Sequence, residues 1–245
     1  MLPEVIKNLL IINGLFFLAT IVLNNTFGLN LIRMLGVYVP GSVHFEPYQL
    51  VTHMFMHGNF GHILLNMFAL WMFGNALENI WGGKRFLIFY LITGFGAAFI
   101  HLGVQYLEAQ AIMNDLLRMG LSKASIEQAL TTGMYTQQGI GGTEGFAKLS
   151  QLSAMYSVPT VGASGAVFGI LLAFGMTFPN QPIYLYFLFP IKAKYFVMGI
   201  GALEIFNGLA NDPASNIAHL AHLGGMLFGF ILIRYWRNND RNFYV

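Results

Sequence analysis

Gly162-Ala163-Ser164-Gly165 opens a short apolar segment that ends near Phe178. A helix of about 15 residues is about 22 Å long, whereas the hydrocarbon core of a bilayer is about 30 Å thick. This helix therefore cannot connect the two surfaces of a membrane. Pro159 disfavours helix just before it, and non-helical backbone is tolerated at membrane depth only when it is buried in protein or faces water. The sequence thus predicts that Ser164 lies at a helix N-terminus, below the membrane surface and facing water.

The composition of the whole chain is that of a membrane protein. Apolar residues make up 56% of the 245 residues and charged residues 9%, against about 25% charged residues in soluble domains. A net charge of +2 is too small to indicate a nucleic-acid partner. Because the chain has no cysteine, disulfides, thiolate metal sites and a cysteine nucleophile are excluded.

Six apolar segments are predicted to be helical membrane spans. We expect an all-α, polytopic membrane domain over residues 1–245, a six-helix bundle with an enlarged outer loop at about 107–158. The first span lacks a convincing small-residue cleavage site, so we interpret it as a retained anchor and not as a signal peptide. The predicted spans lie near residues 7–24, 59–79, 86–106, 163–178, 193–210 and 216–236.

Positive charges predict the orientation of these spans. Six spans put both termini on one side of the membrane, and eight Lys and Arg residues fall on that side against four on the other. This asymmetry favours cytoplasmic termini, which places Ser164 towards the outer face. The eight are Lys7, Lys84, Arg85, Lys192, Lys194, Arg234, Arg237 and Arg241, and the four are Arg33, Arg118, Lys123 and Lys148.

A second polar group, His222, lies in the last predicted span. If this helix begins near Ile217, capped by Ser215 or Asn216, His222 lies about 8 Å along it. That depth is similar to the depth of Ser164. The two polar groups could therefore meet if their helices pack together.

Small residues provide the surfaces for such packing. Gly165, Gly169 and Ala173 are spaced i, i+4, i+8 on the first helix, and Gly225 and Gly229 repeat the spacing on the second. Facing stripes of small residues let membrane helices approach closely. We therefore expect the serine and the histidine to be brought together.

Three ordered motifs contain these residues. They are G-x-S-G at residues 162–165, A-H-x-x-G-x-x-x-G at residues 221–229, and H-x(4)-H-x(3)-N at His57, His62 and Asn66. The ordered set resembles the rhomboid family of intramembrane serine proteases. Residues 73–86 also look like the family's junction between its second and third helices. A lone G-x-S-G is a weak signal, but the ordered set over residues 53–229 is highly specific.

The residues themselves favour nucleophilic catalysis. Ser164 is a weak nucleophile until a neighbouring base accepts its proton, and His222 is the best-placed base in the sequence. His219 is the rival base, but it lacks the glycine that follows His222 three residues on. Glu204 and Asp212 have no evident access to His222, so no third member of a triad is visible. The prediction is a Ser–His dyad, as the resemblance implies.

Peptide hydrolysis also needs hydrogen-bond donors for the developing oxyanion. The N-terminus of the Ser164 helix offers free N–H groups and a favourable dipole, with Gly162 as a supporting residue. By resemblance, His62 and Asn66 complete the oxyanion hole, and the ring of Phe168 packs against the catalytic histidine. The alternatives are purely structural: interhelical hydrogen bonds for the two donors and core packing for Phe168.

A metal site is an alternative interpretation of the three histidines within residues 53–62. The chain has no H-E-x-x-H motif, and no carboxylate accompanies these histidines before Glu78, so we predict no metal and no cofactor. By resemblance, His57 is structural and holds the first outer loop against the second helix. Glu78 is expected to pair with Lys84 or Arg85 and to contribute to stability.

Several connections also have predicted structures. Tyr184, Tyr186 and Phe189 are expected at the level of the lipid headgroups. The segments are an irregular outer loop at 25–58, short helices at 108–119 and 122–130, a flexible stretch at 139–142, and an interfacial turn at 179–192.

The resulting hypothesis is an intramembrane serine endopeptidase that cuts transmembrane substrate proteins in or near their membrane spans, in a bacterial inner membrane. Because helical peptide bonds are shielded by their own hydrogen bonds, a substrate must unwind locally, and the resemblance implies single-pass substrates with helix-breaking residues. One alternative is a catalytically silent rhomboid-like binder or chaperone of membrane proteins, which would normally lack the serine or the histidine. The other is a transporter, which would be expected to show paired repeats that are not evident here.

Overall fold

The computed structural model describes residues 2–133, 142–185, 188–209 and 213–239. Residues 139–141 of the expected flexible stretch lie outside this described part. The elements are α1 (Glu4–Phe27), α2 (Leu31–Leu35), α3 (Gln49–Thr52), the 3₁₀ turn η1 (His53–Phe55), α4 (Phe60–Ala69), the π-helical turn η2 (Leu70–Gly74), α5 (Asn75–Trp81), α6 (Gly83–Arg118), α7 (Lys123–Thr132), α8 (Gly142–Ser157), α9 (Ser164–Thr177), β1 (Pro182–Leu185), β2 (Phe189–Lys192), α10 (Ala193–Leu209) and α11 (Pro213–Asn239).

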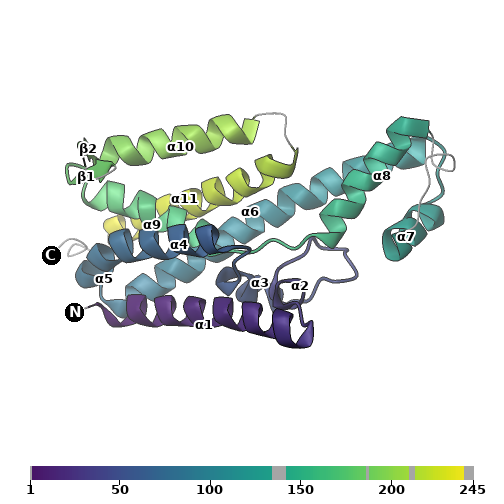
Figure 1. The fold of residues 1–245 in the computed structure, drawn as a ribbon. Coiled ribbons are helices and arrows are strands. Elements are labelled where there is room, and N and C mark those ends of the chain that lie inside the picture. Colours follow the sequence, from purple (N-terminus) through teal and green to yellow (C-terminus); the bar gives the residue numbers. More distant parts are fainter. Residues whose placement is uncertain (1, 134–141, 186–187, 210–212, 240–245) are drawn as a thin grey trace.

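Helices occupy all six predicted membrane spans, so the prediction of an all-α polytopic bundle is confirmed. Among the described residues, α1, the continuous segment Phe60–Trp81 and α6 are long and apolar enough to cross a membrane, and α9 is a shorter apolar helix. Large apolar side chains such as Leu18 on α1 and Phe99 on α6 are exposed on the outside of the bundle, where lipid would cover them. The start of α1 and the end of α11 lie at the same end of the bundle (Figure 1).

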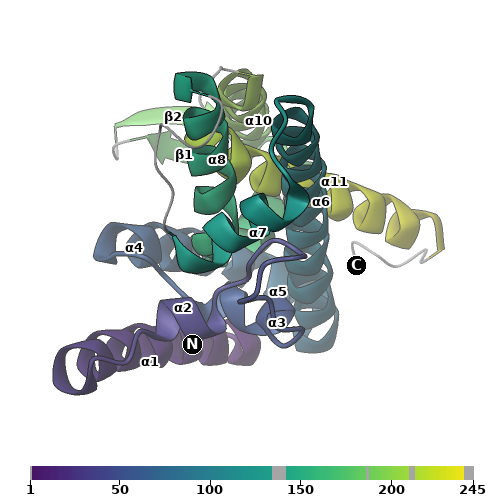
Figure 2. The same cartoon turned by 90° about the vertical axis from the view of Figure 1, so that its right-hand side faces the viewer.

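The short helix α9 lies in the middle of the bundle and contacts α4, α6, α10 and α11. The two helices α1 and α10 lie at opposite edges (Figure 1, Figure 2). Most of α9 is buried, including Ala166, Ile170 and Ala173. At 14 residues it is too short to span the bilayer. The surrounding helices separate its ends, with their free backbone N–H and C=O groups, from lipid.

Small residues let α9, α6 and α11 approach until their backbones touch. A Cβ atom added at Gly225 would overlap the backbone carbonyl of Gly165, and one added at Gly165 would overlap Ala97 on α6. A Cβ at Gly229 would lie 3.3 Å from the Cα of Gly169. The structure thus brings the two predicted small-residue stripes into contact.

Glu78 joins the end of the second span to the start of the first. Its carboxylate accepts hydrogen bonds from the backbone N–H groups of Val5 (2.9 Å) and Ile6 (2.8 Å), which are donors that an α-helix leaves free at its N-terminus. A negative charge at this position also suits the helix dipole. We expected Lys84 or Arg85 as the partner of Glu78 and did not predict these N–H groups, because the residues around Glu78 do not indicate which distant helix begins beside it.

The outer segment 107–158 differs from its prediction. The expected helix at 108–119 is the continuation of α6, which runs through 36 residues without a break. The expected helix at 122–130 is present as α7, whereas α8 was not predicted. Together, α7, α8 and the end of α6 form an arm at one end of the molecule (Figure 1).

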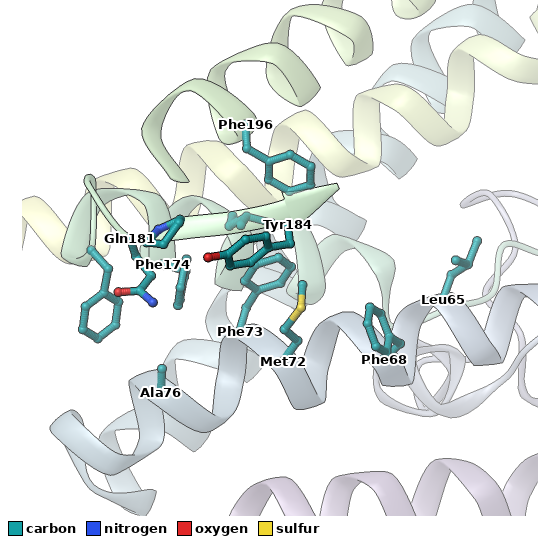
Figure 3. Close-up of a pocket in the computed structure, with 12 residues that line it drawn as sticks. Leu65, Phe68, Met72, Phe73, Ala76, Phe174, Gln181, Tyr184 and Phe196 are labelled. Carbon is teal, nitrogen blue, oxygen red and sulfur yellow. The ribbon is translucent and has the colours of Figure 1, made fainter. Parts of the chain in front are cut away.

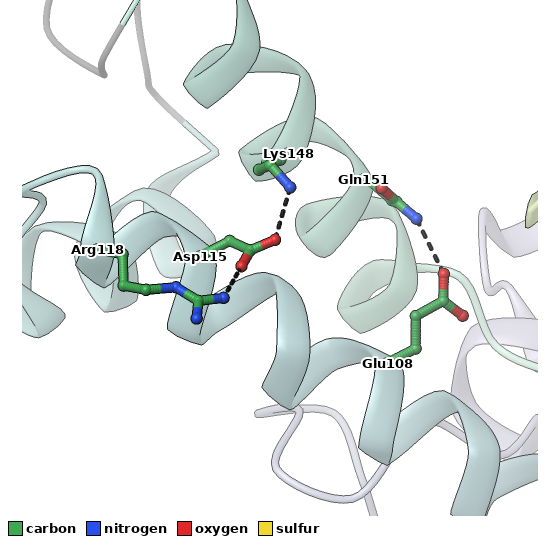
Figure 4. Close-up of polar contacts among 5 residues, drawn as sticks. All are labelled: Glu108, Asp115, Arg118, Lys148 and Gln151. Atoms are coloured by element: carbon green, nitrogen blue, oxygen red, sulfur yellow. Dashed lines mark hydrogen bonds and ion pairs between the residues drawn. The ribbon is translucent and has the colours of Figure 1, made fainter.

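This arm has its own hydrophobic core, separate from the core of the membrane bundle. Polar contacts between α6 and α8 lie beside that core: Lys148 Nζ lies 2.7 Å from Asp115 Oδ2, and Gln151 Nε2 donates to Glu108 Oε1 at 3.0 Å (Figure 4). Exposed ion pairs contribute little to stability, so apolar burial holds the arm together. The buried residues of its core are Ala109, Ile112, Leu116, Ile126, Ala129, Leu149, Leu152 and Met155.

The expected interfacial turn at 179–192 is an antiparallel β-hairpin, in which Pro182 pairs with Lys192 and Leu185 with Phe189. Its two strands form the one sheet among the described residues of this otherwise helical architecture. Tyr184 and Phe189 are exposed, which agrees with the expected place of these rings in a headgroup layer. Tyr186 lies outside the described part.

The contact between Gly225 and Gly165 predicts unequal effects of three glycine-to-alanine substitutions. Gly225→Ala should destabilise the protein by about 1–3 kcal/mol or more, because the methyl group has no space, and Gly229→Ala should have a smaller effect. Gly199→Ala on α10 is the control, since an added Cβ there meets nothing within 4 Å, and it should be neutral or slightly stabilising. The measurement is thermal unfolding in detergent, and equal midpoints for Gly225→Ala and Gly199→Ala would contradict the packing.

Candidate active site

Backbone hydrogen bonds to the first outer loop hold the turn that leads into α9. Thr160 and Val37 form an antiparallel bridge with backbone hydrogen bonds of 2.8 and 2.9 Å, and Gly162 N–H donates to the carbonyl of His53 at 2.9 Å. Gly162 has a φ of 128°, a conformation that side chains rarely adopt. The chain then enters α9 at Ser164, which is half-buried.

The start of α9 has free donors, as the sequence predicted. No side chain caps this helix among the described residues, and the first intrahelical acceptor is the carbonyl of Ala163, which binds the N–H of Val167 at 3.0 Å. The backbone N–H groups of Ser164, Gly165 and Ala166 therefore have no partner within the helix. They form a site for a negatively charged oxygen beside the serine.

His62 lies directly against this turn. A Cβ atom added at Gly162 would lie 2.8 Å from Cε1 and Nε2 of the His62 ring. The side chain of Asn59 caps α4 by accepting from His62 N–H at 2.8 Å. Asn66 is buried, and its Nδ2 donates to the backbone carbonyl of His62 at 3.0 Å. The structure thus places His62 beside the serine turn and Asn66 one helical turn deeper.

His222 faces the same region from α11. Its ring stacks on the ring of Phe168, with the centroids 3.9 Å apart and an angle of 5° between the planes. The contact between Gly225 and Gly165 fixes α11 against α9 one turn below. Among the described residues the Ser164 hydroxyl has no hydrogen-bond partner, and catalytic hydrogen bonds are often long or misaligned before substrate binds.

Glu204 is the residue of this site that sequence reasoning missed. On α10, it is 9% exposed, and its Oε2 atom lies 3.0 Å from Nδ1 of His222 and 2.6 Å from Nδ1 of His219. The expectation that Glu204 has no access to His222 is therefore wrong. Two signals in the sequence point to it. It is an ionisable residue within a membrane span. It also precedes the connection between α10 and α11 by about as many residues as the two histidines follow it, so the three side chains lie at similar depths on neighbouring helices.

The same three side chains are a group that could hold a metal ion. Glu204, His219 and His222 offer ligand atoms that all lie within 4.8 Å of one another. Imidazole and carboxylate ligands suit zinc and related divalent metals. Within the described part of the chain, the histidines of residues 53–62, for which the sequence raised a metal site, do not form such a group.

His57 is 1% exposed in the connection before α4, and neither ring nitrogen has a hydrogen-bond partner among the described residues. Its ring packs edge-on against His62, with 5.1 Å between the centroids. Burial, together with the neighbouring His62, lowers the pKa of His57 to about 4. The neutral ring therefore fills the space between the outer loop and α4.

A small cavity of about 30 Å³ lies beside Ser164. It is lined by His53, His101 and Thr160 among others, and Nε2 of His101 lies 2.6 Å from the Thr160 hydroxyl. A cavity of this size is large enough for one water molecule, and His53, His101, Thr160 and Ser164 give part of its wall polar character.

A much larger apolar pocket of about 1050 Å³ lies between the α4–η2–α5 segment and α10. Aromatic side chains from both sides and from the hairpin point into it (Figure 3). On α4, its lining begins at Leu65, next to Asn66 in the chain. The labelled lining residues are Leu65, Phe68, Met72, Phe73, Ala76, Phe174, Gln181, Tyr184 and Phe196.

The fold and these side chains define a polytopic helical membrane protein with a cluster of polar side chains inside its bundle. The chain belongs to the rhomboid family: the family model described as "Rhomboid domain" matches residues 44–126 and 116–239. This match confirms the resemblance on which the sequence interpretation was built.

Three relatives illustrate the similarity. The chain is 28% identical over 226 residues to RHOMBOID-like protein 12, mitochondrial, of Arabidopsis thaliana. The matched region covers 91% of this chain and 55% of the relative. It is 24% identical over 182 residues to Rhomboid protein 1, mitochondrial, of Saccharomyces cerevisiae, covering 74% and 40%. It is 27% identical over 197 residues to the Presenilin-associated rhomboid-like protein, mitochondrial, of Mus musculus, covering 76% and 38%. The chain spans about half the length of the relatives it matches, or less.

The lowered pKa of His57 predicts a pH dependence of stability. Below pH about 6.5 the unfolded chain binds a proton at this residue, whereas the folded protein does so only near pH 4. Stability should therefore fall as the pH drops from about 6.5 to about 4, by up to about 3 kcal/mol from this group. His57→Leu should flatten this part of the curve, because it removes the ring that takes up the proton. Thermal unfolding in detergent across this pH range measures the effect, and equal slopes for both proteins would contradict it.

Proposed function

We propose that the protein is an intramembrane serine endopeptidase, with Ser164 as nucleophile and His222 as general base. The observation that carries the proposal is the half-buried serine at the N-terminus of α9, with a histidine on the adjoining helix α11 that is seated by the contact between Gly225 and Gly165. Membership of the rhomboid family, which includes serine proteases, supports it.

In this proposal each group has one task in acyl transfer. The Ser164 oxygen attacks the carbonyl carbon of the scissile bond while His222 accepts the hydroxyl proton, and that proton then passes to the leaving amine. The free N–H groups at the start of α9 stabilise the oxyanion. His62 and Asn66 add side-chain donors after a rotation that frees Asn66 from the His62 carbonyl. A water molecule then releases the acyl group, and the cavity beside Ser164 provides space for it.

The substrates are proposed to be transmembrane proteins. The large pocket is mainly apolar and lies between α4 and α10, two helices that both contact α9. A transmembrane segment could bury apolar side chains there and reach the serine from the lipid. Its peptide bonds must leave the helical hydrogen-bonding pattern before they can be attacked, which favours substrates with helix-breaking residues.

The chain is an integral membrane protein, and its orientation is part of the proposal. The excess of Lys and Arg supports cytoplasmic termini with Ser164 towards the outer face. The bacterial inner membrane expected from the sequence has no support from the relatives, whose names place them in mitochondria.

A fluorophosphonate probe tests the nucleophile. The probe should attach covalently to Ser164, and Ser164→Ala should abolish labelling and lower cleavage of a transmembrane substrate by a factor of at least about 10⁴. Mass spectrometry of the labelled peptide identifies the site. A folded wild-type protein that neither labels nor cleaves would favour the silent binder, and labelling of another serine would exclude the assignment.

The role of Asn66 separates an oxyanion hole from a metal-dependent reaction. As a donor that matters in the transition state, Asn66 should affect turnover more than substrate affinity. Asn66→Ala should therefore lower kcat about 10²- to 10³-fold, equivalent to about 3–4 kcal/mol, with KM and thermal stability nearly unchanged. Chelators should leave cleavage intact. Inhibition by chelators that added metal reverses, together with a silent Asn66→Ala, would favour metal-dependent chemistry instead.

A further inference from the structure

The ring of His222 is constrained on one face and at one nitrogen. Phe168 covers a face of the imidazole at 3.9 Å, and the Glu204 carboxylate lies 3.0 Å from Nδ1. The two contacts come from different helices, α9 and α10, while the ring itself is carried by α11. A planar ring held in this way has little rotational freedom left.

The contact with Glu204 also determines which nitrogen carries the proton. A carboxylate accepts hydrogen bonds, so Nδ1 of His222 must be the donor. In the neutral imidazole the other nitrogen, Nε2, then has a free lone pair and can accept a proton. This is the tautomer that a histidine needs to act as base towards a serine hydroxyl.

We infer that Glu204 is a positioning residue that converts the predicted Ser164–His222 dyad into a Ser164–His222–Glu204 triad. The inference rests on the proposed function and adds to it a residue that the family motifs of this chain do not contain. Glu204 does not touch the substrate and takes up no proton in the reaction. It orients His222 and stabilises the imidazolium that forms when the Ser164 proton moves to Nε2.

The electrostatic setting strengthens this contribution. Glu204 is nearly buried, and electrostatic interactions are stronger there than in water. In the described part of the chain, its hydrogen-bond partners are the imidazoles of His222 and His219. The positive charge that develops on His222 therefore meets a carboxylate that no described lysine or arginine pairs with.

His219 acts on the carboxylate and not on the serine. Its Nδ1 lies 2.6 Å from the same Oε2 atom, one helical turn before His222. The two rings are 6.3 Å apart, and Phe168 stacks on His222. This geometry assigns the base to His222 and leaves His219 to hold Glu204 in place.

The first experiment compares Glu204→Gln and Glu204→Asp with wild-type protein in detergent or liposomes. Glutamine keeps the size of the side chain but can donate to Nδ1 and so favour the wrong tautomer. Glu204→Gln should lower kcat on the order of 10²- to 10⁴-fold, with KM and the unfolding midpoint nearly unchanged and slower probe labelling. Glu204→Asp should recover part of this loss. Glu127→Gln on the exposed face of α7 is the matched control.

A second measurement does not depend on activity or on a Glu204 variant. In Ser164→Ala protein with ¹⁵N-labelled histidine, the His222 signals should report a proton on Nδ1 and an unprotonated Nε2.

A ranking of activities completes the test. His222→Ala should be the least active variant, Glu204→Gln the next, and His219→Ala should keep the most activity of the three.

The outcomes separate the two proposals. If wild type cleaves, Ser164→Ala does not, and Glu204→Gln turns over at the wild-type rate, the triad is overturned and the protease stands. A proton on Nε2 of His222 also overturns the triad. A wild-type protein that neither labels nor cleaves overturns both.

Discussion

The close approach of α9 to α11 is the constraint on which the rest of the structure depends. Gly225 lies so near the carbonyl of Gly165 that no side chain fits between them. Because lipid supplies little hydrophobic driving force between helices, close packing of this kind stabilises a membrane bundle. It also lets a 14-residue helix begin inside the bundle, where neighbouring helices surround its N-terminus. The half-buried serine follows from these two facts.

Three polar groups inside the bundle have partners on other elements. Glu78 binds free N–H groups of α1, Gly162 binds the carbonyl of His53, and Glu204 binds two histidines of α11. An unpaired polar group in hydrocarbon costs several kcal/mol, so these contacts fix how the helices sit relative to one another. Only the last of these three contacts joins ionisable side chains to one another.

The sequence was informative where the physical signal is local or periodic. Apolar runs located all six helices of the bundle, and Gly165, Gly169, Gly225 and Gly229 predicted the contact between α9 and α11. It was uninformative where a partner lies far away in the chain. The partners of Glu78, the contact of Glu204 with His222, and the packing of α8 on the extended α6 all depend on tertiary geometry. Glu204 was considered as a third member of a triad and set aside, because its contact with His222 becomes evident only once α10 and α11 are placed side by side.

The turn before α9 connects the outer arm to the site. The arm helix α8 ends at Ser157, and the chain enters α9 seven residues later. Three contacts fix this short stretch and its approach: Ser42 Oγ donates to the Tyr156 carbonyl at 2.7 Å, Thr160 pairs with Val37, and Gly162 binds His53. All three partners belong to the first outer loop. Two sets of contacts therefore fix the position of the serine: the hydrogen bonds of this loop to the turn before α9, and the contact of Gly165 with Gly225 on α11. A displacement of α8 would therefore act on the serine turn through a stretch that these loop contacts hold, whereas α6 continues from the arm directly into the bundle and contacts α9.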